Sequence, residues 1–130
     1  MVCVDTDVII DFLRNESRAV KKIKELKDSE VEICTTTINS FELFKGAFRS
    51  KRNNSIELVS SFLNNLKILS FDLKASEEAA KIFESLRAKG KIIDPLDLMI
   101  ASVAVTNDKP LLTRNIKHFE RISNLKIDNV

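Results

Sequence analysis

Residues 2–11 read VCVDTDVIID, an apolar stretch that contains three aspartates. Its first three residues are small and apolar, as in a short buried strand, and the apolar residues after Asp7 recur with the spacing of a helix. Asp5 and Asp7 therefore fall where a strand ends and a helix begins, and Asp11 follows one turn later. A buried carboxylate without a partner is unfavourable. These side chains therefore cap the helix, lie on its exposed surface, or bind a cation.

The three aspartates differ in how well a purely structural role explains them. Asp7 is well placed to cap the helix, near the positive end of the helix dipole. Asp5, at the carboxyl end of the strand, is harder to explain as a cap. Asp11 lies inside the helix, and we expect its side chain to be exposed to solvent.

Short strand-like runs alternate with longer helical ones along the rest of the chain. We expect strands near residues 1–4, 31–34, 67–71, 110–113 and 125–127. We expect helices near residues 7–14, 17–27, 38–48, 55–66, 72–90 and 94–105, and a short one within residues 116–122. The pattern predicts an α/β fold, a three-layer α/β/α arrangement with a central, mostly parallel sheet of four to five strands. In such folds, sites form beyond the carboxyl ends of the strands.

Composition sets few limits on function. A chain of 130 residues, 44% of them hydrophobic, suits one domain. A net charge of +2 neither indicates nor excludes a nucleic-acid partner. With no secretory leader and no apolar run of about 20 residues, we expect a cytoplasmic protein without a membrane span. Cys3 and Cys34 lack zinc-ligand spacing, and we interpret them as core thiols rather than a disulfide.

Further carboxylates stand in unusual surroundings. Asp94 and Asp97 fit the first turn of a helix around Pro95, and capping alone could explain both. The helix after Asp97 is so apolar, however, that we expect this carboxylate at the edge of the sheet. Glu42 lies between the apolar residues Phe41 and Leu43, so it is either a solvated helix residue or points inward to a cation.

Four segments resemble, in order and spacing, the motifs of the PIN domain family, and in particular of small VapC-type toxins. They are VDTDVIID (4–11), TTTINSFELFKGA (35–47), DLMIASVAV (97–105) and LLTRNIKHFERI (111–122). The resemblance implies that residues 1–130 form a single PIN-like domain. It also implies a Mg²⁺-dependent endoribonuclease, the toxin of a type II toxin–antitoxin pair, with Asp5, Glu42 and Asp97 as the catalytic, metal-binding acids.

The chain departs from the family at a fourth, often acidic position, where it has Asn115. An amide offers an oxygen without charge, so whether the site holds one metal or two is open. Asp94 is a possible substitute, and the resemblance makes Asp7 an accessory residue. Hydroxyls of Thr6 and Thr113, at strand ends, are expected to support the site by hydrogen bonds or merely to satisfy turns.

An all-oxygen site favours Mg²⁺ or Mn²⁺, which activates water and neutralises charge on a phosphodiester. Lys45 and Arg49 follow Glu42, and Arg114 precedes Asn115, so these residues are candidate RNA contacts, although a solvated basic surface is equally consistent. His118 is the only histidine, and we expect no catalytic role for it.

The family further implies a VapB-type antitoxin and a homodimer as partners. The apolar helix face of Phe41, Phe44 and Phe48 belongs either to the core or to such a partner surface. Two alternatives stay open. One is a phosphatase of the haloacid dehalogenase type, with Asp5 as nucleophile and Asp7 as acid/base, and the other is a catalytically degenerate PIN binding module. RNA or DNA preference and the cleavage sequence do not follow from the residues.

Overall fold

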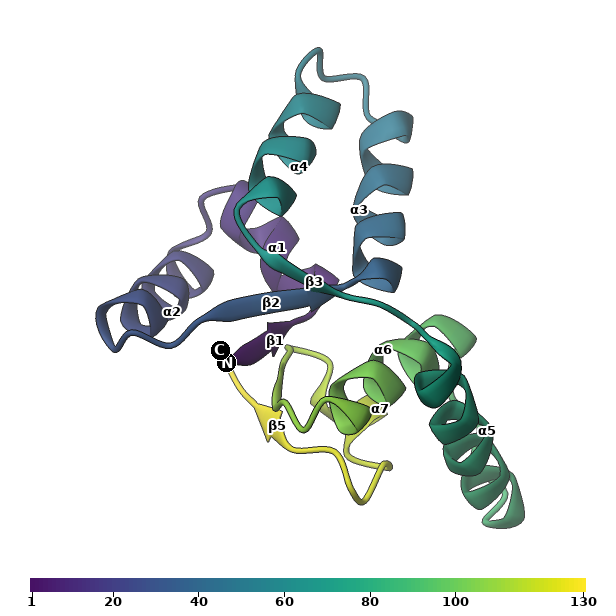
Figure 1. Ribbon diagram of the computed structural model, residues 1–130. Coiled ribbons are helices and arrows are strands. Elements are labelled where there is room, and N and C mark those ends of the chain that lie inside the picture. Colours follow the sequence, from purple (N-terminus) through teal and green to yellow (C-terminus); the bar gives the residue numbers. More distant parts are fainter.

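The computed structural model describes residues 1–130, which form one five-stranded sheet with helices on both faces (Figure 1). The strands are β1 (Val2–Val4), β2 (Ile33–Thr36), β3 (Lys67–Leu69), β4 (Leu111–Leu112) and β5 (Ile127–Asp128). Their order is β3-β2-β1-β4-β5, and every neighbouring pair is parallel. The predicted three-layer fold is confirmed, and the sheet is wholly rather than mostly parallel.

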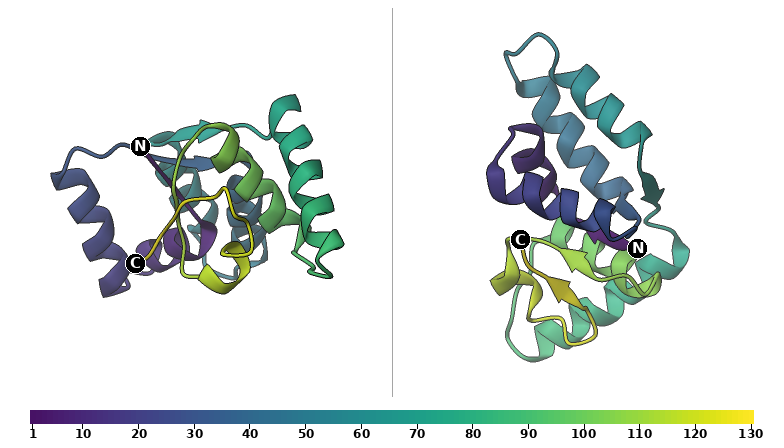
Figure 2. Two further views of the ribbon diagram at one scale, coloured as in Figure 1. Left: turned by 90° about the horizontal axis from the view of Figure 1, so that it is seen from below. Right: turned by 90° about the vertical axis from the view of Figure 1, so that its left-hand side faces the viewer.

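The helices divide between the two faces in chain order. One face carries α1 (Thr6–Leu13), α2 (Ser17–Asp28), α3 (Thr37–Arg49) and α4 (Ser55–Asn64). The other carries α5 (Leu73–Ala88), α6 (Pro95–Thr106) and α7 (Ile116–Phe119). The right-hand view of Figure 2 shows these two helical layers above and below the sheet. No helix combines the length and the apolarity that crossing a membrane requires.

Alternation along the strands builds two separate cores. Val2 and Val4 pack against α1 to α4, whereas Cys3, between them, packs against α5 and α6. This is the period-two pattern of a strand that is covered on both faces. Cys3 lies opposite Cys34 in the register of β1 and β2, and both thiols are free and buried, as the sequence predicted.

The local signals that begin and end helices act as expected in the second half of the chain. Asp72 caps α5 by accepting a hydrogen bond from the Ala75 amide, and the chain leaves this helix through Gly90 at φ 70°, a conformation that glycine adopts without strain. Asp94 caps α6, with Pro95 at its first position. The interior of α6 is fully buried around Ile100, so the first turn of this helix has a fixed position.

Strand order places one edge of the sheet at a topological switch point. From β1, the chain crosses to β2 on one side, and β4 occupies the other side. Because the three strands are parallel, their carboxyl ends meet, and the residues that follow them, Asp5, Thr37 and Thr113, lie at the same edge. This is where sites form in parallel α/β sheets.

Replacing Ile100 with Ala should lower the free energy of unfolding by about 2–5 kcal/mol, because it opens a cavity in the centre of α6. Ile92→Ala is the matched control, since Ile92 is 85% exposed and its loss should change stability by less than about 0.5 kcal/mol. Urea unfolding followed by circular dichroism measures both. Equal effects of the two substitutions would contradict this description of the core.

Candidate functional site

Asp5 lies at the centre of the site, at the carboxyl ends of the parallel strands, and is buried, with 5% of its surface exposed. Its Oδ1 accepts hydrogen bonds from the Thr6 amide at 2.9 Å and from Asn39 Nδ2 at 3.1 Å. Its Oδ2 accepts a hydrogen bond from the Thr113 hydroxyl at 2.7 Å. Three of the four lone-pair positions of the carboxylate are therefore used, and each bond comes from a different segment of the chain.

The sequence-based assignment of the helix cap was wrong. Asp5, not Asp7, is the N-cap of α1, and Asp7 lies within the first turn. The Asp7 carboxylate accepts hydrogen bonds from the Val8 amide at 2.7 Å and from the Arg114 amide at 3.1 Å. Asp7 thus ties the loop after β4 to α1, because the strand order places that loop directly beside the helix start.

Glu42 is half-buried on α3 and joins Asp5 through a short hydrogen-bonded chain. The Thr6 hydroxyl donates to Glu42 Oε1 at 2.6 Å and accepts from Asn39 Nδ2 at 2.9 Å. The apolar residue Leu43, next in sequence, is buried in the core, so α3 is rotated with Glu42 toward the edge of the sheet. Thr6 and Thr113 hold the carboxylates by hydrogen bonds, in the manner that the sequence suggested.

Asn39 is a site residue that the sequence reasoning missed. It is fully buried, and its Oδ1 accepts from the amide and hydroxyl of Thr36 at 3.2 and 2.7 Å. The bond from the Thr36 backbone amide and the reciprocal bond from the Asn39 backbone amide to the Thr36 hydroxyl, at 3.1 Å, form a capping box at the start of α3. Nδ2 of Asn39 is left free to donate to Asp5 and Thr6. The signal in the sequence was the Thr36–Asn39 pair, whose spacing of three residues is that of a capping box.

Asp97 approaches the cluster from the first turn of α6. Its side chain is 18% exposed, and its Oδ2 lies 3.6 Å from His118 Nδ1. Asp94 is exposed and caps α6 through bonds from the Leu96 and Asp97 amides at 2.9 and 3.4 Å. Capping accounts for its contacts, and the structure gives it no bond to the other acids.

His118, near Asp97, and Asp11, near Asp7, have contacts that the sequence did not indicate. His118 Nδ1 lies 2.9 Å from Asn115 Nδ2 and 3.6 Å from Asp97 Oδ2, so the histidine borders the acidic cluster. Asp11 was expected to be solvated, but its side chain is only 14% exposed and its Oδ2 forms an ion pair with Arg114 Nη1 at 2.7 Å, without the alignment of a hydrogen bond. Arg114 reaches Asp11 because the Asp7 bond holds its backbone against α1.

The candidate RNA contacts are exposed around this edge. The Arg114 side chain is 56% exposed despite its ion pair. Lys45 and Arg49 are exposed on α3, one and two turns after Glu42, and the Lys45 ammonium lies 5.6 Å from the centre of the Phe41 ring. All three cations are therefore accessible to solvent.

The acidic cluster has more negative charge than its surroundings balance. Burial, followed by the charge of Asp7, raises the pKa of Asp5 to about 7, and hydrogen bonds from Thr113 and Thr6 oppose this rise only in part. Burial and the charge of Asp94 raise the pKa of Asp97, to which Glu42 also contributes. Burial likewise raises the pKa of Asp7. Carboxylates that resist ionisation together in this way are typical of a site that binds a cation.

The donor set fits a hard divalent ion in its chemistry. Asp5, Glu42 and Asp97 offer carboxylate oxygens, and Asp5 keeps one lone-pair position unused. As the side chains stand, no group of three acidic, histidine or cysteine residues is gathered closely enough to coordinate one ion. The Glu42 and Asp97 side chains would have to turn toward Asp5 to share an ion with it. A cavity of about 540 Å³ lies elsewhere, between Phe12, Ile23, Phe62 and Leu66.

Known proteins resemble the chain over nearly its whole length. The sequence profile of the PIN domain matches residues 2–125. The tRNA(fMet)-specific endonuclease VapC of Salmonella typhimurium is 28% identical over 127 residues, which cover 97% of this chain and 95% of that protein. Ribonuclease VapC1 of Methanocaldococcus jannaschii is 30% identical over 121 residues, which cover 93% and 80% of the two chains.

Solved structures agree with the sequence matches. In the crystal structure of VapBC2 from Rickettsia felis bound to a promoter DNA fragment, one chain superposes with a TM-score of 0.91 and 28% identity, covering 100% of this chain and 99% of that one. A chain of the DNA-bound VapBC of Salmonella typhimurium gives a TM-score of 0.88 at 28% identity, with 99% and 98% covered. The structural similarity therefore includes every helix and strand that carries a residue of the acidic cluster.

The metal-free protein should lose stability as the pH rises from about 4 to about 7. An unfolded chain releases the Asp5 proton near its ordinary pKa of 3.8, whereas the folded chain keeps it up to about pH 7. The stabilisation is therefore complete below pH 4 and is lost through pH 7. Urea unfolding in the presence of a chelator measures this slope. Asp5→Asn should flatten the slope, and Asp28→Asn, at an exposed position, should not; an unchanged slope in Asp5→Asn would refute the assignment.

Asn39→Asp should destabilise the protein by about 3 kcal/mol or more at pH 8, because a buried charge would replace the amide that donates to Asp5 and Thr6. The loss should be smaller at pH 5, where the new carboxyl can be protonated and donate. Asn54→Asp is the control, since Asn54 is exposed and makes no capping bond. A pH-independent loss would mean that Asn39 only fills space.

Proposed function

The chain belongs to the PIN domain family, and we propose that it is a metal-dependent endoribonuclease, the toxin of a type II toxin–antitoxin pair. The observation that carries this proposal is the burial of the Asp5 carboxylate beside Asp7 and Asp97, whose negative charges oppose its ionisation. The names of the relatives, a tRNA(fMet)-specific endonuclease and a ribonuclease, support RNA as the substrate.

We assign Mg²⁺ or Mn²⁺ to Asp5, Glu42 and Asp97. When bound, the ion would supply a water of lowered pKa and neutralise charge on the scissile phosphodiester. The protein's own part is to orient the carboxylates: Thr113 and Asn39 fix Asp5, and Thr6 fixes Glu42. Asn115 contributes no charge, which favours a single ion over two.

The RNA backbone is held by the exposed cations at this edge. Lys45 and Arg49 extend from α3 beside Glu42, and Arg114 borders Asp7 on the opposite side. A strand that passes between them would place a phosphate over the acidic cluster, with charge-assisted hydrogen bonds to its neighbours. Arg114 would have to share its guanidinium between the phosphate and Asp11.

The phosphatase alternative fits the geometry poorly. The helix α1 begins at Thr6, directly after Asp5, which leaves no room for a flap over the site. Both carboxylate oxygens of Asp7 accept backbone amide hydrogens, from Val8 and Arg114. An acid/base residue needs an oxygen that can reach the substrate, so Asp7 is better suited to anchoring the loop. A degenerate binding module has only Asn115 in its favour.

The partner we propose is a VapB-type antitoxin, in agreement with the VapBC complexes among the similar structures. A groove between α1, α3 and α4, of about 270 Å³, is lined by apolar residues that include Ile10, Leu13 and Leu58, and Glu42 lies on its wall. An antitoxin segment in this groove would end beside the acidic cluster and block it. We place the pair in the cytoplasm.

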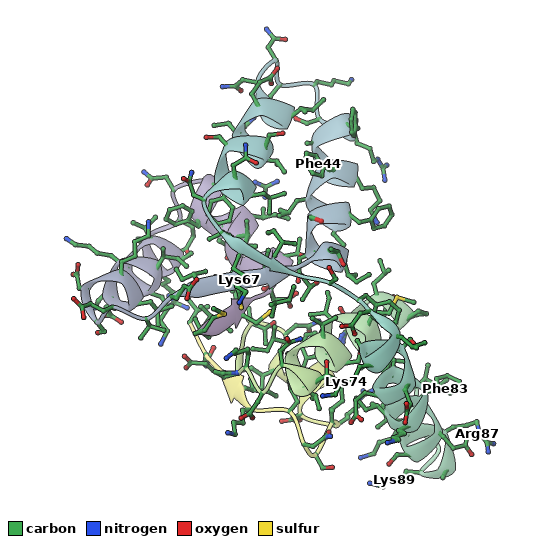
Figure 3. All side chains as sticks on the ribbon, in the orientation of Figure 1. Phe44, Lys67, Lys74, Phe83, Arg87 and Lys89 are labelled. Carbon is green, nitrogen blue, oxygen red and sulfur yellow. The ribbon has the colours of Figure 1, made fainter.

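A homodimer is the second assembly we propose. Phe41 and Phe48 on α3 are 53% and 72% exposed, so the phenylalanine face is not all core, although Phe44 is half-buried. Phe83 projects from the outer side of α5 (Figure 3) and is 52% exposed. Large exposed apolar side chains of this kind are typical of surfaces that a protein partner covers.

Purified protein should cleave RNA only with added Mg²⁺ or Mn²⁺, and Asp5→Asn should lower the rate about 10²-fold or more, because the ion's transition-state stabilisation is lost. Asp7→Asn should stay within about tenfold of wild type, since the amide keeps an oxygen for one of the two backbone bonds. Both variants are first checked for folding by circular dichroism and then assayed on RNA.

The same proteins are assayed on a small phosphomonoester. Hydrolysis of the phosphomonoester that disappears in Asp7→Asn, with RNA left intact by every protein, would replace the nuclease proposal with the phosphatase alternative. Binding of RNA without cleavage at any metal concentration would favour the degenerate module.

A further inference from the structure

The only histidine of the chain faces the acidic cluster. His118 Nδ1 lies 2.9 Å from Asn115 Nδ2 and 3.6 Å from Asp97 Oδ2. The δ nitrogen of the ring is therefore turned toward the acids. The side chain is 53% exposed, so the ring lies at the boundary between the acidic cluster and solvent.

The short helix α7 holds the ring in this place. Phe119, the next residue, is fully buried, and Ile122 is 3% exposed. Before His118 in the chain, the backbone amide of Asn115 donates to the Thr113 hydroxyl at 2.9 Å, and the backbone amide of Arg114 donates to the Asp7 carboxylate. The backbone on both sides of the histidine is thus fixed to the core and to the same residues that hold Asp5.

Nδ1 of His118 and Oδ2 of Asp97 are close enough to bind one ion together. Metal–ligand distances of about 2.0–2.2 Å on each side allow two donors up to roughly 4 Å apart to share a metal. We propose that His118 Nδ1 is a ligand of the metal site, beside Asp97. This inference rests on the proposed function, because it assumes that the acidic residues hold a divalent ion.

A neutral nitrogen ligand suits the charge of this site. The amide of Asn115, beside the ring, brings no charge to this side of the site. An imidazole adds a donor without adding to the repulsion among Asp5, Asp97 and Asp94. Binding at Nδ1 replaces the contact with Asn115 Nδ2, whose amide can turn toward solvent.

A nitrogen ligand also changes which ion the site prefers. Mg²⁺ strongly favours oxygen ligands, whereas first-row transition ions accept imidazole readily. The site should therefore select Mn²⁺ over Mg²⁺ more strongly than an all-oxygen site would. Replacement of His118 by Gln, an oxygen donor, should remove that advantage.

Because the chain has a single histidine, isotopic labelling can test the bond directly. Full-length protein without a histidine tag is prepared with ¹⁵N-histidine or with natural nitrogen, loaded with Mn²⁺, and measured by pulsed electron paramagnetic resonance. Wild type should show a nitrogen coupling that changes from ¹⁴N to ¹⁵N with the label. His118→Gln should bind Mn²⁺ without that coupling, and Lys117→Gln, the exposed neighbour, should keep it.

Affinities provide the second measurement. The Kd for Mn²⁺ should rise about 10–100-fold in His118→Gln, while the Kd for Mg²⁺ changes by less than about threefold. If the wild type binds Mn²⁺ without a histidine coupling, and Asp5→Asn does not bind Mn²⁺, the role of His118 is overturned. The proposed nuclease function would then stand. Wild-type protein that binds neither ion would overturn both.

Discussion

The burial of the Asp5 carboxylate at the end of the central strand is the constraint on which the site depends. Its three hydrogen bonds come from Thr6, Asn39 and Thr113, which follow three adjacent parallel strands. Each bond is possible only if the strands end at the same level. The register of the sheet therefore determines the geometry of the site. The repulsion from neighbouring acids is what a cation would relieve.

Much of this arrangement could be predicted from the sequence, because it depends on local signals. The apolar residues before Asp5 indicated the first strand, and the Asp94–Pro95 pair indicated the start of α6. The placement of Asp5 at the ends of the strands followed from the rule that parallel strands end together, whereas the resemblance to the PIN domain assigned Glu42 and Asp97 to the same site. Their electrostatic coupling is visible in the pKa values of Asp5 and Asp97.

The sequence could not predict contacts between residues that are distant in the chain. Asp7 looked like a cap, yet its partner, the Arg114 amide, lies more than a hundred residues away. Asp11 looked solvated for the same reason, because its ion pair needs Arg114. Asn39 and His118 lie within the segments that resemble the family, but their roles were not predicted, because only the packing of α3 and α7 brings them to the acids. Strand order, which local patterns do not encode, decides these contacts.

Proton release on metal binding tests the central claim that the buried Asp5 carboxylate binds a divalent cation. With a pKa of about 7, the Asp5 carboxyl is protonated in about three-quarters of the metal-free molecules at pH 6.5. Mn²⁺ binding should therefore release about three-quarters of a proton from this group, measured by calorimetry in buffers of different ionisation enthalpy. Tight Mn²⁺ binding without proton release, or equal release from Asp5→Asn, would contradict the claim.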